Sequence, residues 1–368
     1  MSLDSQNPGL IQRLNLGLTL STFLIFIAGI TTLYSATHGP GIQSLSKMQV
    51  IYFVAGLVVA AILFFVESEI LYKVSYVTYA VCLVLLGLVL VVGHVGNGSQ
   101  RWINLGFFRL QPSEFAKIAI VLTLARFFTD DQRGGPYSLR RLVLPALLIL
   151  PYFILIKKQP DMGTAGIVFL TAASMILFVG VDWKSIVIVA LVAVVSLPLA
   201  YKYVLHDYQK NRVKTFLDPT SDPRATGYNA LQCRIAVGSG QVIGKGYMSG
   251  TQAQLNFIPE QHTDFIFSVF AEERGFIGAL ILLGFYGAYL FFGFRTVERA
   301  RDKYETLVAF GLTAVMFWHV FINIGMVIGL LPIVGVTLPL FSYGGSSMMM
   351  FMISTGLLLN ISRKRYIF

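Results

Sequence analysis

Three acids and an arginine lie in the stretch DFIFSVFAEERG, at the head of a long apolar run: Asp264, Glu272, Glu273 and Arg274. Helical spacing places Glu272 about 12 Å below Asp264. At that depth in a bilayer an unpaired charge is costly, so both glutamates need partners, with Arg274 as the local candidate. Asp264 lies at the membrane–water boundary, where a carboxylate can act as a general base. It could equally be a helix N-cap, since Asp is a favoured cap.

A second polar stretch, QRWINLGFFRLQPSEFAKI, combines two arginines with an acid–base pair. Pro112 predicts a helix start, and Glu114 is favoured in the first turn by the helix dipole. Glu114 and Lys117 are three residues apart, so they share a face and can pair. This pair either holds helices together or lines a polar pocket with Arg101 and Arg109, whose guanidinium groups suit a phosphate or pyrophosphate.

Further candidates come from shorter motifs. Asp161 in KKQPDMGTA precedes an apolar run, where an N-cap role needs no further function. GSGQVIGKG fails as a phosphate-binding loop because Ser239 occupies the position where that motif needs glycine, which leaves Lys245 as a residue that could lie near a lipid phosphate. Glu260 and His262 directly precede Asp264 and extend the polar group there.

The elements that must position these residues are membrane helices. Of the 368 residues 55% are hydrophobic and 12% charged, against about 25% charged in soluble domains. Ten apolar blocks approach the roughly 20 residues needed to cross a bilayer. We therefore expect an all-α, polytopic membrane protein forming one domain over residues 1–368. The ten expected spans are Leu14–Tyr34, Met48–Val66, Val74–Val92, Pro112–Phe128, Leu142–Ile156, Gly163–Val179, Ile186–Val204, Asp264–Phe294, Leu307–Leu330 and Ser346–Ile361.

The distribution of Lys and Arg predicts the orientation of the chain. With both termini inside, the inner segments hold fourteen basic residues and the short outer loops five, the bias expected of cytoplasmic loops. The net charge of +10 is then mostly positive-inside charge, and nucleic-acid binding is not expected. The inner residues are Arg13, Lys73, Arg126, Arg133, Arg140, Arg141, Lys184, Arg295, Arg299, Arg301, Lys303, Arg363, Lys364 and Arg365, and the outer ones are Lys47, Arg101, Arg109, Lys157 and Lys158.

Two extracytoplasmic connections are predicted to be folded. Residues 205–263 form one long loop, in which TGYNALQCRIAVGSG is typical of a short amphipathic helix on the outer membrane surface. Residues 329–347 contain prolines and paired glycines that indicate a folded loop or re-entrant turn, with Ser346 or Ser347 capping the last helix. Cys82 and Cys233 are too few for a metal cluster, and a disulfide between them is not expected.

Taken together, these stretches resemble the SEDS family (shape, elongation, division and sporulation) over most of the chain, in order. Gln261 in PEQHTDFIF and the short N-terminal tail are typical of its RodA-like branch, whereas Arg274 departs from the family pattern. The resemblance implies a peptidoglycan glycosyltransferase that polymerises lipid II at the outer face of the bacterial cytoplasmic membrane. The family's essential acid falls on Asp264, and its pocket residues fall on Glu114, Lys117, Arg101, Arg109 and Asp161.

The implied reaction is inverting, with Asp264 as general base on the 4-hydroxyl of the acceptor GlcNAc. A divalent cation, Mg²⁺ or Mn²⁺, could be held by Asp264, and no organic cofactor is expected. The implied partners are a class B penicillin-binding protein, the elongation machinery, lipid II and undecaprenyl-linked glycan. A lipid II flippase that uses the same polar residues as a translocation path is the main alternative, and a non-catalytic scaffold is a third.

Overall fold

Ten long helices form the body of the protein in a computed structural model that describes residues 15–37, 44–96, 99–104, 106, 109–203, 207–219, 226–255 and 257–363. Each predicted apolar block forms one of them, although the predicted start at Leu14 lies outside the described residues. The ten are α2 (Leu16–Ala36), α3 (Ser44–Phe64), α4 (Ser68–Val92), α5 (Pro112–Asp130), α6 (Val143–Lys158), α7 (Met162–Val179), α8 (Trp183–Tyr203), α12 (Ile266–Glu298), α13 (Lys303–Val327) and α14 (Gly345–Arg363).

Length and composition make the chain a polytopic, all-helical membrane protein. Within the described residues, 8 of the helices are long and apolar enough to cross a membrane. The two that fall short are α6, with 16 residues, and α5, which carries Glu114, Lys117 and Arg126. The number of crossings therefore remains a prediction for these two helices.

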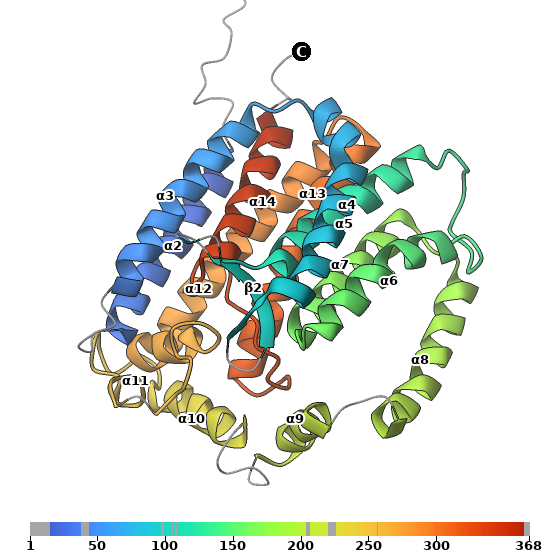
Figure 1. Cartoon of the computed structure of the whole chain (residues 1–368). Coiled ribbons are helices and arrows are strands. Elements are labelled where there is room, and N and C mark those ends of the chain that lie inside the picture. The colour runs from blue at the N-terminus through green and yellow to red at the C-terminus, as the bar shows by residue number, and fades with distance from the viewer. Residues whose placement is uncertain are drawn as a thin grey trace, which may run out of the picture.

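Small residues bring the central helices close together. α14 packs along α3, and α12 lies between α2 and α13 (Figure 1). A side chain at Gly356 would meet the backbone of Ala60 at 2.7 Å, and one at Gly29 would meet the backbone of Phe341 at the same distance. Such close approach is typical of helix packing in membranes. By contrast, α8 stands apart from the bundle, and only 6% of its most apolar stretch is buried (Figure 1).

One end of the bundle, the loop end, carries most of the irregular structure (Figure 1). A small antiparallel sheet precedes α5, formed by β1 (His94–Gly96), β2 (Ser99–Asn104) and β3 (Arg109–Leu110). The all-α prediction missed it. The long connection after α8 contains α9 (Asp207–Leu217), α10 (Thr226–Ser239) and α11 (Thr251–Gln254). The helix predicted from TGYNALQCRIAVGSG is therefore confirmed, and α10 packs against α12.

α12 is not the straight span that the sequence predicted. Gly275 has φ 64°, a left-handed conformation that breaks the helix in two. The segment after α10 docks at this kink, with Lys245 N donating to Glu272 O at 3.0 Å and Phe276 N donating to Gln241 O at 2.9 Å. The docked backbone lies so close that a Cβ at Gly275 would be 2.3 Å from Gly244 N. The kink frees backbone groups of α12 for hydrogen bonds with this segment and leaves space for its close approach.

The two acids in α12 find partners across the fold rather than in their own sequence neighbour. Glu272 is fully buried and forms an ion pair with Lys245 at 2.7 Å. Glu273 accepts hydrogen bonds from Ser35 and from Met248 N. The prediction that these acids need partners is confirmed. Among the described residues Arg274, whose guanidinium lies over Tyr247, forms no ion pair with either acid.

The connection between α13 and α14 is folded, as predicted, and buried side chains hold it in place. Gln49 donates to Ser342 O at 2.8 Å and accepts from Gly344 N, and Tyr286 donates to Pro339 O at 2.7 Å. The prediction that Ser346 or Ser347 caps α14 is wrong, because the helix already begins at Gly345.

Candidate active site

A polar cavity of about 790 Å³ opens at the loop end, where α5, α7, α12 and α14 begin. Six of the eight predicted site residues line it. Those six are Arg101, Arg109, Glu114, Asp161, His262 and Asp264. The cavity therefore brings together residues from three separate parts of the chain, 101–114, 161 and 262–264.

Asp264 lies just before α12, not in it. The N-cap residue is Phe265, and no side chain caps this helix. The alternative reading of Asp264 as an N-cap is therefore wrong. Within the described residues no side chain pairs with its carboxylate, and Gly335 leaves room for it, since a Cβ there would lie 3.2 Å from Asp264 Oδ2. The carboxylate is left facing the cavity.

The surroundings of Asp264 favour its neutral form. Desolvation raises the pKa of this carboxyl to about 7, and the negative charges of Glu260 and Asp161 add to the effect. The cations Arg101 and Arg212 act in the opposite direction. A carboxyl whose pKa lies near neutrality can accept and return a proton, as a general base must.

Backbone hydrogen bonds fix the segment that carries Asp264. Tyr343 N donates to His262 O at 2.9 Å, and the buried side chain of Gln261 donates to Ala36 O at 3.1 Å. His262 lines the cavity, and burial lowers the pKa of its imidazole, against the opposing charge of Glu260. The segment is thus anchored to both α2 and the turn before α14.

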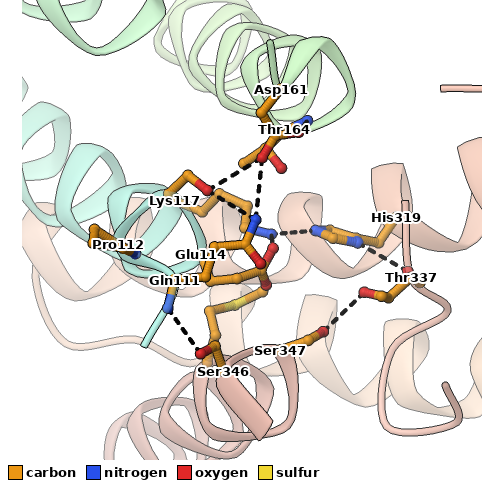
Figure 2. A network of polar contacts seen from close by, with 12 residues as sticks. Gln111, Pro112, Glu114, Lys117, Asp161, Thr164, His319, Thr337, Ser346 and Ser347 are labelled. Carbon is orange, nitrogen blue, oxygen red and sulfur yellow. Dashed lines mark hydrogen bonds and ion pairs between the residues drawn. The ribbon is translucent and has the colours of Figure 1, made fainter. Parts of the chain in front are cut away.

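The predicted Glu114–Lys117 pair is confirmed and extends to a third residue (Figure 2). Lys117 Nζ lies 2.9 Å from Glu114 Oε1 and 2.7 Å from His319 Nε2, and the lysine is completely buried. His319 Nδ1 lies 3.1 Å from Thr337 O. A carbonyl only accepts, so Nδ1 carries the proton and Nε2 accepts from Lys117. Glu114 and His319 line the cavity, and Lys117 lies behind them.

Asp161 combines the structural role predicted for it with a position in the cavity wall. It is the N-cap of α7 and accepts from Thr164 N at 3.3 Å. Its other oxygen accepts from Gln111 and Ser113, as Figure 2 shows in part. Arg101 lies 3.8 Å away and is itself held by Gln159 O at 3.0 Å. This network joins the starts of α5 and α7 to the sheet.

Three arginines, Arg101, Arg109 and Arg212, line the cavity together with its acids. Arg109 is exposed, and its charge acts on the nearby Tyr343 hydroxyl. Arg212, from α9, also lines the cavity. The N-termini of α5, α7, α12 and α14 contribute their partial positive charges. The combination suits an anionic ligand of pyrophosphate size.

Lys245 is the one predicted site residue that the fold places elsewhere. Its ammonium contacts Glu272 Oε1 at 2.7 Å and Thr251 Oγ1 at 2.9 Å, at the kink of α12. It does not line the cavity. A role at a lipid phosphate stays a prediction, and this lysine already serves as the counter-ion of a buried acid.

Sequence reasoning missed His319, Asn323 and Arg212. The first two lie in α13, in the apolar run MFWHVFINIGMV, and polar residues in a membrane helix are a recognised signal of function. Arg212 sits in the long connection, where a single arginine has no distinguishing pattern. Over the described residues, no three His, Cys, Asp or Glu side chains are grouped as ligands of a metal ion.

Comparison with known proteins agrees with this geometry. The family model described as "Cell cycle protein", which covers FtsW, RodA and SpoVE, matches residues 10–367. The peptidoglycan glycosyltransferase MrdB of Escherichia coli (strain K12) is 43% identical over 287 residues, 78% of this chain and 77% of MrdB. The stage V sporulation protein E of Bacillus subtilis (strain 168) is 38% identical over 295 residues, 78% of this chain and 79% of that protein.

Solved structures show the same fold. A chain described under "Structural coordination of polymerization and crosslinking by a peptidoglycan synthase complex" is 33% identical, with a TM-score of 0.83 over 96% of this chain and 99% of its own. The rod shape determining protein RodA of Thermus thermophilus is 31% identical, with a TM-score of 0.72 over 96% of this chain and 98% of its own. The chain therefore belongs to the family of FtsW, RodA and SpoVE, the SEDS family that its motifs resemble.

Proposed function

We propose that this chain is a peptidoglycan glycosyltransferase that polymerises lipid II into glycan strands. The observation that carries the proposal is an acid of raised pKa, Asp264, facing a cavity that three arginines also line. Curated relatives that share over a third of its residues are named peptidoglycan glycosyltransferases. Such a site suits an enzyme that joins sugars with loss of a pyrophosphate leaving group.

In the proposed mechanism Asp264 accepts the proton of the 4-hydroxyl of the acceptor GlcNAc. The oxygen attacks C1 of the MurNAc at the end of the growing strand, on the face opposite the α-linked pyrophosphate. The C1–oxygen bond to pyrophosphate breaks, undecaprenyl pyrophosphate leaves, and a β-1,4 bond forms with inversion. A base with a pKa near 7 suits this step, because it is partly ionised at neutral pH and still takes the proton.

The leaving pyrophosphate gains negative charge as the bond breaks, and the arginines of the cavity compensate that charge. Arg101, Arg109 and Arg212 line the cavity, and the helix N-termini point the same way. Arg101 is already held in place by Gln159 and Asp161, so it loses little freedom on binding. Such preorganised groups favour the transition state over the bound substrate.

Glu114 offers the substrate a hydrogen-bond acceptor in the same cavity. Its Oε2 is buried and, among the described residues, has no hydrogen-bond partner. Lys117, which also donates to His319 Nε2, holds the opposite oxygen and so fixes the carboxylate. We assign Glu114 Oε2 to a hydroxyl or amide N–H of the lipid-linked sugar, because a buried acceptor without a donor is unfavourable.

A divalent cation, Mg²⁺ or Mn²⁺, stays a proposal. Asp264 is the one carboxylate of the cavity wall without a partner among the described residues, so the pyrophosphate would have to supply most of the other oxygens. Such an ion would supply electrostatic stabilisation of the leaving group. Titrating each metal into the polymerisation assay, with and without a chelator, tests this directly.

We further propose that the cavity faces the outside of the bacterial cytoplasmic membrane, with both termini in the cytoplasm. The distribution of basic residues supports this orientation. The proposed partner is a class B penicillin-binding protein of the elongation machinery. In support, a chain of similar structure comes from a complex that coordinates polymerization and crosslinking.

Polymerisation by purified protein tests the proposal and separates it from the flippase alternative. The chain is reconstituted with lipid II, and glycan length is measured by gel after removal of the peptides. Wild type should make glycan, while Asp264→Asn should lose about 100-fold or more of the rate, as typical of a general base. Asp130→Asn, at the opposite end of the bundle, is the matched control and should retain the rate. Lipid II transport without any polymer would leave the flippase reading ahead.

A further inference from the structure

Asn323 stands out among the buried polar residues near the cavity. It lies in α13, is completely buried, and does not line the cavity. Its Nδ2 donates to Asp264 O at 2.9 Å and to Val336 O at 2.6 Å. One amide group thus bridges the backbone of the proposed base and the backbone beside Gly335.

The chemistry of the two partners fixes the orientation of this amide. Both are carbonyl oxygens, which only accept hydrogen bonds, so the NH₂ end must face them. Its Oδ1 is buried and, within the described part of the chain, has no partner. The Asp264 carbonyl lies outside the helical ladder, since the first hydrogen bond of α12 runs from Ser268 N to Phe265 O. Asn323 therefore supplies the donor that this carbonyl needs.

The bridge controls the geometry on both sides of the Asp264 carboxylate. The carbonyl belongs to the same residue as the carboxylate, so its position sets the origin of the side chain. The second carbonyl adjoins Gly335, whose Cα faces Asp264 Oδ2 so closely that a Cβ would lie at 3.2 Å. Loss of the bridge would therefore free the backbone of Asp264 and the backbone beside Gly335 to move at the same time.

We infer that Asn323 is a positioning residue for the reaction, which holds Asp264 at the working distance from the acceptor hydroxyl. This inference rests on the proposed function of Asp264. The competing explanation is that Asn323 only satisfies buried carbonyls and stabilises the fold, as buried amides commonly do.

The chain contains a matched control for that explanation. Asn360, in α14, is also completely buried, and its Nδ2 donates to the carbonyls of Leu63, Phe64 and Val66 at 2.6–3.0 Å. Its Oδ1 likewise has no partner in the described residues. It joins α14 to the end of α3, at the opposite end of the bundle from the cavity. The two asparagines therefore share their local chemistry and differ in whether Asp264 depends on them.

The experiment compares Asn323→Ala with Asn360→Ala in nanodiscs containing lipid II. We expect similar losses of stability in both, but only Asn323→Ala should lower kcat, by about 10-fold or more, because a displacement of about 1 Å can cost about 100-fold. KM for lipid II should stay within about twofold, since the substrate contacts are untouched. Asn323→Asp keeps the shape of the side chain, removes the NH₂ donor, and should reproduce the loss.

Hydrogen exchange gives a readout that does not depend on activity. Peptides that cover residues 257–270 and 331–341 should exchange faster in Asn323→Ala than in wild type, and should be unchanged in Asn360→Ala. Equal kcat in the two alanine variants, or unchanged exchange in both peptides, would overturn the inference. An inactive wild type together with faster exchange would instead contradict the proposed function and leave the bridge itself supported.

Discussion

The buried ion pair behind the cavity makes a strong prediction about stability. Lys117 has no exposed side-chain surface and Glu114 only 7%, and they lie 2.9 Å apart. Replacing Lys117 by Met keeps most of the volume but leaves the Glu114 carboxylate without its counter-ion and His319 Nε2 without a donor. Breaking a buried pair in this way costs about 3–5 kcal/mol, against a total stability of about 5–15 kcal/mol.

A double-mutant cycle separates the charge from the packing. Lys117→Met alone should lower the free energy of unfolding by about 3–5 kcal/mol. The double variant Glu114→Gln with Lys117→Met removes both charges and should recover a large part of that loss, as coupled neighbours do. Polymerisation should stay low in the double variant, because the amide no longer presents the fixed carboxylate oxygen to the substrate.

The measurement is equilibrium unfolding in mixed micelles with increasing SDS, followed by tryptophan fluorescence, alongside the polymerisation rate. Arg133→Ala is the control, because its guanidinium is 66% exposed in its pair with Asp131 and such pairs contribute little. If Lys117→Met and Arg133→Ala unfold at the same denaturant concentration, the pair is not a buried one and the reasoning fails.

Three further predictions concern pH, space and orientation. The polymerisation rate should rise with pH along a limb near pH 7, where Asp264 ionises. The raised pKa means that the folded state binds the proton of Asp264 more tightly than the unfolded state does, so the wild type loses stability as pH rises and Asp264 ionises. Asp264→Asn cannot ionise, so it should be more stable than wild type at pH 8 and equally stable at low pH. Gly335→Ala should lower the polymerisation rate, because the new Cβ would lie 3.2 Å from Asp264 Oδ2. Gly135→Ala adds the same backbone strain, with a φ of 81°, but has open space around it and should keep the wild-type rate. Equal rates in the two variants would contradict this reasoning. Leu217→Cys in α9 should react with an impermeant maleimide from outside intact cells, and labelling only after lysis would reverse the orientation.

Periodicity and composition predicted the helices well because a membrane span needs a long apolar run, which is visible in any single sequence. The Glu114–Lys117 pair was also predictable from local sequence, because residues three apart share a helix face. The cavity itself was accessible mainly through the family resemblance, which grouped arginines, acids and turns that lie far apart in the sequence.

What escaped prediction depends on contacts between distant segments. The sequence around Glu272 does not indicate that its counter-ion is Lys245. The two lie 27 positions apart, and only the docking of a loop brings them together. The kink at Gly275 follows from the same docking. His319 and Asn323 were visible as polar residues in an apolar run, but their partners are Lys117, 202 positions from His319, and backbone carbonyls, which no sequence pattern marks.

The docked segment at the α12 kink has a consequence for biogenesis. During insertion, α12 presents Glu272 and Glu273 to the membrane machinery before any tertiary contact exists, and charged residues within a span oppose entry. The apolar part that begins at Phe276 must therefore direct insertion by itself, with the first turns left at the interface. When residues 240–251 fold back onto the kink, Lys245 becomes the counter-ion of Glu272, and Met248 N donates a hydrogen bond to Glu273. A chain in which this segment has not docked therefore carries unpaired acids in α12, the helix that begins directly after the segment with Asp264.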